Sequence, residues 1–187
     1  FGQLNDSLPN LFSMMPLDQS IQVFVTGGTF DKTYDYINGT LNFQETHLPQ
    51  MLDRSRCKLD IDVKTLMLLD SLELTTDHFK TIIEACETSE RKQIVITHGT
   101  DCMVDTAMKI ATEANAIENK TIILTGAMIP YTFGSSSDGF FNLGSAMAFV
   151  RVLDPGVYIA MNGMLFNWDE VEKNKSIGVF ERITTNK

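Results

Sequence analysis

Long apolar runs and positive charge are both scarce in this sequence. A helix that spans a bilayer needs about 20 consecutive apolar residues, and no stretch of the 187 residues approaches that length. The 15 Lys and Arg residues are outnumbered by 24 Asp and Glu residues, so the net charge is −9. Proteins that bind nucleic acids without sequence preference neutralise phosphates with Lys and Arg. We therefore expect neither a membrane protein nor a nucleic-acid-binding protein.

Cysteine is rare as well, with three residues at positions 57, 86 and 102. Their odd number and wide spacing do not resemble a disulfide framework, and a chain of this length buries enough apolar surface to fold without one. The first 20 residues lack the basic start and the compact apolar run of a secretory signal peptide. These absences indicate a reducing compartment, and we expect the protein in the cytoplasm.

Several enzyme motifs are missing from the chain. There is no glycine-rich dinucleotide fingerprint, no Walker A lysine loop and no Gly-x-Ser-x-Gly nucleophile elbow. The three histidines, His47, His78 and His98, are scattered, and no His/Cys pair has the spacing of a zinc site. The candidate nucleophiles that remain are side-chain hydroxyls.

Short apolar runs alternate along the chain with amphipathic stretches. The runs are rich in β-branched residues, as buried parallel strands are, and the stretches between them place apolar residues on one helical face. This alternation predicts βαβ units and a three-layer α/β/α fold with a mainly parallel, doubly wound sheet of the flavodoxin or Rossmann type. The predicted strands are Ile21–Val25, a segment within Asp62–Leu69, Gln93–Thr97, Thr121–Thr125 and Val157–Met161, and the predicted helices are residues 76–86, 103–114 and 140–152.

The pattern indicates one domain with short additions at its ends, as suits a chain of this length. Residues 31–48 are polar, show no clear period and directly follow the first strand, which predicts a loop or hairpin over the strand ends. We expect residues 1–20 to form an N-terminal arm, residues 21–176 to form the α/β domain, and residues 177–187 to form a C-terminal tail.

Two glycine-containing loops follow predicted strands and carry threonines. Residues 26–29 (Thr-Gly-Gly-Thr) follow the first strand, and residues 98–101 (His-Gly-Thr-Asp) follow the third. In open parallel sheets, ligands bind outside the carboxyl ends of the strands, so Thr29 and Thr100 are candidate nucleophiles. A threonine hydroxyl needs a base, which Asp101 or a lysine of lowered pKa could provide. Either loop by itself is also explained as a plain turn or a helix cap.

Five segments, in order, resemble the bacterial-type L-asparaginase/glutaminase family. Residues 21–175 carry the resemblance, which is that of a short-chain member, or else a fragment, similar to the N-terminal catalytic domain. The segments are residues 26–29, residues 70–75 (Asp-Ser-Leu-Glu-Leu-Thr), residues 95–107 (Val-Ile-Thr-His-Gly-Thr-Asp-Cys-Met-Val-Asp-Thr-Ala), residues 126–130 (Gly-Ala-Met-Ile-Pro) with 137–143, and residues 161–163 (Met-Asn-Gly) with 171–173 (Val-Glu-Lys).

The resemblance implies a set of catalytic residues. Thr29 is the primary nucleophile on the side-chain amide carbon, and Tyr34 assists it from the loop that follows, with Tyr36 as a rival for that role. Thr100, Asp101 and Lys173 form a second cluster, in which Lys173 activates Thr100 or a water bound to it. The implied reaction converts L-asparagine to L-aspartate and ammonia through an acyl-enzyme, with no cofactor and no metal.

The resemblance also implies how the substrate is held. Ser71 and the backbone at Gly99 and Thr100 bind the α-carboxylate, and Asp101 pairs with the α-ammonium group. Backbone N–H groups of the glycine loops, at Gly28 and Gly99, stabilise the oxyanion. Two neighbouring residues receive structural interpretations: His98 steadies its loop, and Cys102 is a small buried thiol.

Three departures from the family pattern leave alternatives open. The usual members carry a second, C-terminal domain that completes the active site of a neighbouring subunit, so we expect a homodimer or homotetramer here. Leu72 stands where a polar substrate-binding residue is expected, which favours glutamine or another related amide as an alternative substrate. The missing acidic partner of the tyrosine allows a third reading, a non-catalytic amino-acid-binding or assembly module.

Overall fold

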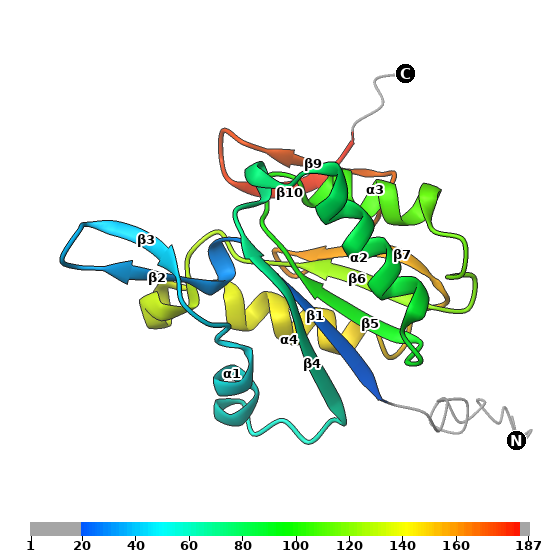
Figure 1. Cartoon of the computed structure of the whole chain (residues 1–187), viewed down its shortest axis with the longest axis horizontal. Helices are drawn as coiled ribbons and strands as arrows, with labels where there is room; N and C mark the ends of the chain where they lie inside the picture. The colour runs from blue at the N-terminus through cyan, green and yellow to red at the C-terminus, as the bar shows by residue number, and fades with distance from the viewer. Residues whose placement is uncertain (1–19, 184–187) are drawn as a thin grey trace, which may run out of the picture.

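The computed structural model describes residues 20–183, which fold around a six-stranded sheet (Figure 1). The first five strands in spatial order are parallel, and the sixth is an antiparallel edge strand. All five strands predicted from the sequence are present. The strands are, in spatial order, β4 (Ile61–Leu69), β1 (Ile21–Gly27), β5 (Gln93–Thr97), β6 (Thr121–Thr125), β7 (Gly156–Met161) and β8 (Met164–Asn167).

Helices cover both faces of the sheet, which confirms the predicted three-layer fold. Helices α2 (Thr76–Thr88) and α3 (Met103–Glu113) pack on one face, where their apolar side chains join those of the strands in one core. Helices α1 (Leu48–Arg54) and α4 (Gly139–Phe149) contribute to a second core on the other face. Helix α4 ends three residues earlier than expected, and α1 was not predicted. None of the helices within residues 20–183 is long and apolar enough to span a bilayer.

Helix α2 is fixed at both ends by side chains. At its start, Thr75 and His78 form a reciprocal capping box, which satisfies N–H groups that have no partner inside the helix. At its end, the Lys120 ammonium donates to the carbonyl oxygens of Cys86, Glu87 and Ser89 at 2.6, 2.7 and 2.8 Å. Lys120 is only 6% exposed, and its charge opposes the negative end of the helix dipole.

Two hairpins and three short 3₁₀ turns complete the described chain. Strands β2 (Lys32–Asp35) and β3 (Thr40–Phe43) form an antiparallel hairpin, which we call the arm, and it projects from the body in Figure 1. The arm confirms the hairpin interpretation of residues 31–48. The second hairpin pairs β9 (Val171–Asn174) with β10 (Val179–Arg182). The 3₁₀ turns are η2 (Thr29–Asp31), η3 (Ser71–Glu73) and η4 (Tyr131–Ser136).

The structure describes the predicted C-terminal domain boundary but not the segment before the N-terminal one. The segment expected to be a tail from residue 177 contains strand β10, and its Phe180 is 4% exposed within the first core. Because an apolar ring is buried there, the α/β unit continues through residue 182 instead of ending at 176. The N-terminal segment expected to form a separate arm, residues 1–20, lies outside the described residues except for Ser20.

The strand order places three loops at one edge of the sheet. After β1 the chain adds β4 on one side, and it then adds β5 on the other side of β1. The carboxyl ends of β4, β1 and β5 therefore adjoin at the point where the strand order reverses, which is where ligands bind in such sheets.

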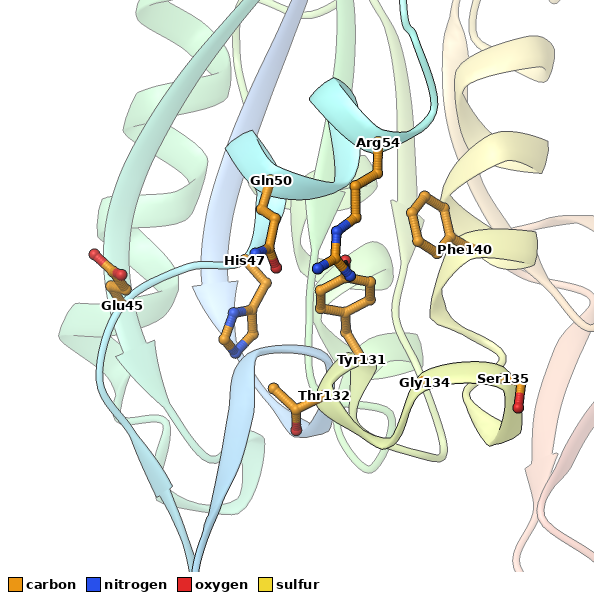
Figure 2. A pocket seen from close by; sticks show the side chains of 9 residues that line it. All are labelled: Glu45, His47, Gln50, Arg54, Tyr131, Thr132, Gly134, Ser135 and Phe140. Atoms are coloured by element: carbon orange, nitrogen blue, oxygen red, sulfur yellow. Dashed lines mark hydrogen bonds between the residues drawn. The ribbon is translucent and has the colours of Figure 1, made fainter.

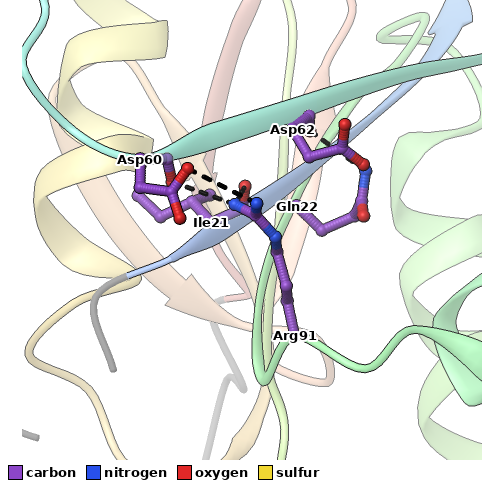
Figure 3. Close-up of polar contacts among 5 residues, drawn as sticks. All are labelled: Ile21, Gln22, Asp60, Asp62 and Arg91. Carbon is purple, nitrogen blue, oxygen red and sulfur yellow. Dashed lines mark hydrogen bonds and ion pairs between the residues drawn. The ribbon is translucent and has the colours of Figure 1, made fainter. Parts of the chain in front are cut away.

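At the opposite end of the sheet, where the strands begin, polar contacts join β1 to β4 (Figure 3). The Arg91 guanidinium donates from Nη1 to the carbonyl oxygens of Ile21 and Asp60, each at 3.0 Å, and Gln22 donates to the carbonyl oxygen of Asp62 at 3.0 Å. These bonds join the starts of β1 and β4. The amino ends of the two strands are thus held together, while their carboxyl ends carry the loops.

Candidate active site

Backbone contacts between glycines bring the three loops together. Gly28 has φ of 74°, and a Cβ atom added there would lie 2.3 Å from Cα of Gly99. A Cβ atom on Gly99 would lie 2.6 Å from Oγ of Ser71. A side chain at either glycine would push the loops apart. The glycines therefore hold Thr29, Ser71 and Thr100 on neighbouring, touching loops.

Lys173 joins the loop after β5 from a distant part of the sequence. Its Nζ atom donates to Oγ1 of Thr100 at 2.8 Å and to Oδ1 of Asp101 at 2.8 Å. The Lys173 side chain is 10% exposed, whereas that of Asp101 is 37% exposed. The lysine is thus enclosed with the threonine hydroxyl, while the Asp101 carboxylate keeps a face open to solvent. Charge-assisted bonds of this length are the stronger kind.

A relay of asparagine side chains fixes the hairpin that carries Lys173. Asn142 donates to the carbonyl oxygen of Gly126 at 3.0 Å and accepts the N–H of Asn162 at 3.1 Å. Asn162 in turn accepts the N–H of Phe180 at 2.9 Å, and Phe180 pairs with Lys173 across the hairpin. The position of the lysine is therefore tied to the carboxyl end of β6. Sequence reasoning missed both asparagines as positioning residues, although both lie in the quoted segments.

His98 is buried within the loop it was expected to steady. It is 0% exposed, its Nδ1–H donates to the carbonyl oxygen of Gly99 at 2.7 Å, and its Nε2 lies 2.9 Å from the Thr106 hydroxyl. Burial lowers the pKa of His98 to about 4, so the imidazole is neutral near pH 7. The neutral ring holds the Gly99 carbonyl and thereby the direction of the loop.

Cys102 lies beside the cluster as a half-buried thiol. Burial raises its pKa, and the nearby carboxylates of Asp105 and Asp101 raise it further. The thiolate is the nucleophilic form of cysteine, so this environment disfavours a nucleophilic role.

An ion pair joins the arm to the loop after β4. Lys32, the first residue of the arm, lies with Nζ 2.6 Å from Oδ2 of Asp70, the residue before Ser71. The Lys32 ammonium holds the pKa of Asp70 below its ordinary value, and Lys173 adds a smaller electrostatic contribution. Sequence reasoning did not select Lys32 or Asp70, although Asp70 directly precedes Ser71 and Lys32 lies two residues before Tyr34.

The two remaining catalytic candidates make no hydrogen bond to the lysine cluster among the described residues. Thr29 is half-buried in η2, and Tyr34 is 51% exposed on the arm. Within residues 20–183, no hydrogen bond joins either hydroxyl to another residue. Tyr36, the rival of Tyr34, is 83% exposed near the arm's tip. The structure thus brings together Gly28, Ser71, Gly99, Thr100, Asp101 and Lys173, and both tyrosines are exposed.

Comparison with known proteins decides the family. A sequence profile of the family described as "Asparaginase, N-terminal" matches residues 20–184. This chain belongs to the asparaginase family. The resemblance predicted from the five segments is thereby confirmed.

Relatives of this asparaginase-family chain are longer than the chain itself. It is 33% identical over 123 residues to the L-asparaginase of Thermococcus kodakarensis, covering 64% of this chain and 36% of that protein. It is 38% identical over 87 residues to the glutaminase-asparaginase of Acinetobacter glutaminasificans, covering 45% of this chain and 25% of that protein. The solved structure of the thermostable L-asparaginase from Thermococcus kodakarensis matches with a TM-score of 0.73 at 29% identity, covering 88% of this chain and 51% of that one. The chain thus spans between a quarter and about half of these relatives.

Proposed function

We propose that this asparaginase-family chain hydrolyses the side-chain amide of L-asparagine to L-aspartate and ammonia. The observation that carries the proposal is the Lys173 ammonium on Thr100 and Asp101, at 2.8 Å from each, beside two loops held in contact by glycines. The family match over residues 20–184 and the likeness to proteins named L-asparaginase support the reaction class.

The chemistry we propose is covalent catalysis by threonine. The Thr29 hydroxyl oxygen attacks the amide carbon, its proton passes to the amide nitrogen, and the C–N bond breaks, which releases ammonia and leaves an ester on Thr29. Water then hydrolyses the ester, which frees aspartate and restores the hydroxyl. Tyr34 assists the first step when the arm approaches, and Lys173 acts through Thr100 or through water bound to it.

Charge complementarity supports the proposed substrate orientation. The open face of the Asp101 carboxylate pairs with the α-ammonium group. The Ser71 hydroxyl and the backbone N–H groups at Gly99 and Thr100 receive the α-carboxylate. The Gly28 N–H donates to the carbonyl oxygen of Leu69 at 2.8 Å, so it holds the loop and does not reach the substrate. The developing oxyanion is then stabilised by another backbone N–H of the glycine loops, one that the α-carboxylate does not occupy.

The test of the threonine mechanism is to trap the acyl-enzyme. Wild-type protein mixed with asparagine and quenched in acid should carry an aspartyl ester, which peptide mapping by mass spectrometry places on Thr29. Thr29→Ala should lose the ester and most of the ammonia release. An ester on Thr100 in the wild type would contradict the assignment of the nucleophile, and absence of both ester and ammonia would contradict the function.

A homodimer or homotetramer is part of the proposal, because the site of one chain has an exposed side. Tyr34 has no acidic partner among residues 20–183, and Tyr36 and Ile37 on the same arm are 83% and 79% exposed. A neighbouring chain would supply the acidic group and cover the arm. Light scattering during size-exclusion chromatography should show an oligomer, and a monomer with full activity would contradict this assembly.

Glutamine hydrolysis is a second candidate function. Leu72 is 70% exposed next to Ser71, and one relative carries the name glutaminase-asparaginase. Ratios of kcat/KM for asparagine and glutamine decide between the substrates, and equal values would contradict the preference for asparagine. A non-catalytic amino-acid-binding module remains the third candidate, and it requires asparagine to bind without any ammonia release above that of Thr29→Ala.

A further inference from the structure

A separate cavity lies behind the base of the arm (Figure 2). Its volume is about 620 Å³, and its walls come from the segment before α1, from α1, from η4 and from the first turn of α4. That volume falls within the range of small-molecule sites. None of the residues assigned to amide hydrolysis lines it. The lining residues are Glu45, His47, Gln50, Arg54, Tyr131, Thr132, Gly134, Ser135 and Phe140.

Arg54 provides a fixed positive charge in this cavity. Its Nη1 atom donates to the Tyr131 hydroxyl at 2.9 Å, and its guanidinium carbon lies 6.0 Å from the centre of that ring. Tyr131 is 5% exposed and therefore a firm support. Among the ion pairs of residues 20–183, none involves Arg54. A supported guanidinium without a carboxylate partner is suited to a planar anion from outside the chain.

Flat apolar surfaces adjoin the guanidinium. The rings of Tyr131 and Phe140 meet edge to face with centres 5.3 Å apart, and the His47 ring lies 5.5 Å from that of Tyr131. Phe140 is 39% exposed and offers part of its ring to the cavity. Glu45 lines the same cavity, and its negative charge disfavours a ligand with more than one negative charge. The surroundings therefore select an aromatic ring with a single carboxylate.

Two cavity residues also hold the arm. Nε2 of His47 lies 3.1 Å from the Thr33 hydroxyl, and the Thr132 hydroxyl donates to the carbonyl oxygen of Lys32 at 3.2 Å. Both bonds end on strand β2. A ligand that restrains His47 and Thr132 therefore restrains the arm that carries Tyr34.

We propose that this cavity is a binding site for a small aromatic monocarboxylate, and that its occupancy stabilises the arm. The carboxylate lies on Arg54, and the ring packs against Phe140 and His47. Binding does not depend on amide hydrolysis, so the site and the proposed reaction stand or fall separately.

Benzoate is the probe for the binding test, with acetate as the charge without the ring and benzyl alcohol as the ring without the charge. NMR titration of the full chain should show saturable benzoate binding with a Kd on the order of millimolar, as befits so small a ligand. Acetate and benzyl alcohol should each bind at least about tenfold more weakly, because each lacks one half of the recognition. Equal affinity for all three probes would overturn the proposal.

Arg54→Gln should weaken benzoate binding at least about tenfold, while Arg54→Lys should retain part of the affinity because it keeps the charge without the planar fork. Arg56→Gln is the matched control, since it removes the same charge two residues away and outside the cavity lining. Unchanged affinity in Arg54→Gln, or an equal loss in Arg56→Gln, would overturn the site.

Hydrogen exchange tests the link to the arm. Saturating benzoate should slow amide exchange in residues 33–43 severalfold in the wild type and leave it unchanged in Arg54→Gln. Benzoate binding without slower exchange in the arm would overturn the claim that occupancy stabilises it.

Discussion

Gly28 illustrates at the scale of one residue how closely the candidate site is packed. Its φ of 74° is matched by Gly39 at 68°, but a Cβ at Gly39 would meet nothing within 4 Å. At Gly28 the φ of 74° is combined with a ψ of −174°, a conformation that is essentially restricted to glycine, and alanine there also clashes with the Gly99 backbone. We expect Gly28→Ala to lower the free energy of unfolding by about 2 kcal/mol more than Gly39→Ala. Urea denaturation measures both, and equal losses would contradict the close contact.

His98 gives stability a dependence on pH. Its pKa is lowered from 6.5 to about 4 by burial, so the unfolded chain binds a proton more readily between those two values. Its contribution is complete above pH 6.5 and declines as the pH falls toward 4, and between pH 7.5 and 5 the loss should be about 2 kcal/mol. His98→Gln should remove the part of the pH dependence of the free energy of unfolding that His98 contributes. Unfolding free energies at the two pH values test this, and an identical slope in both proteins would refute it.

Lys120 acts at the scale of an element, because it closes the end of helix α2. Replacing it with methionine leaves three carbonyl oxygens without their donor at a buried site. We expect Lys120→Met to lower the free energy of unfolding by about 3 kcal/mol. Exposed Lys92 is the control, and Lys92→Met should change the free energy of unfolding by less than about 0.5 kcal/mol. Thermal or urea unfolding decides, and similar values for the two variants would show that the cap contributes little.

The elements also show which parts of the fold could be predicted from the sequence. Strands β1, β5 and β6 are buried along their whole length, so each appears as a short, β-branched apolar run, interrupted in β1 only by Gln22, that predicts a central strand. Helix α1 has seven residues, too few to display a helical period. Strand β10 has four residues, and the expected tail therefore hid a strand whose Phe180 is buried.

The candidate site could likewise be predicted from the sequence only in part. The loops after β1 and β5 could be located because glycines and threonines directly follow recognisable strands. The contact of Lys173 with Thr100 joins residues 73 positions apart, and no local pattern encodes it. Only the family resemblance pointed to that lysine. The relay through Asn142 and Asn162 depends on side-chain amides meeting backbone groups across the fold, which spacing alone does not reveal.

In the molecule as a whole, the described chain is an α/β unit whose strand order places the loops after β4, β1 and β5 together at the carboxyl ends of the strands. At the opposite end of the strands, Arg91 joins the starts of β1 and β4. The arm reaches out from the edge that carries the loops, and its base is held by Lys32 on Asp70 and by the cavity residues His47 and Thr132. The proposed hydrolysis needs the arm to approach, so both the assembly and the cavity ligand would act on the same moving part.

Ammonia release from asparagine by Lys173→Met, compared with Lys175→Met, tests whether Lys173 belongs to the catalytic machinery. Both variants remove one lysine from the same hairpin, but only Lys173 contacts Thr100 and Asp101. We expect kcat to fall by about a thousandfold or more in Lys173→Met, as for members of a catalytic unit, and to stay within about twofold of wild type in Lys175→Met. Equal activity in wild type and Lys173→Met would show that the contact of Lys173 with Thr100 and Asp101 has no part in hydrolysis.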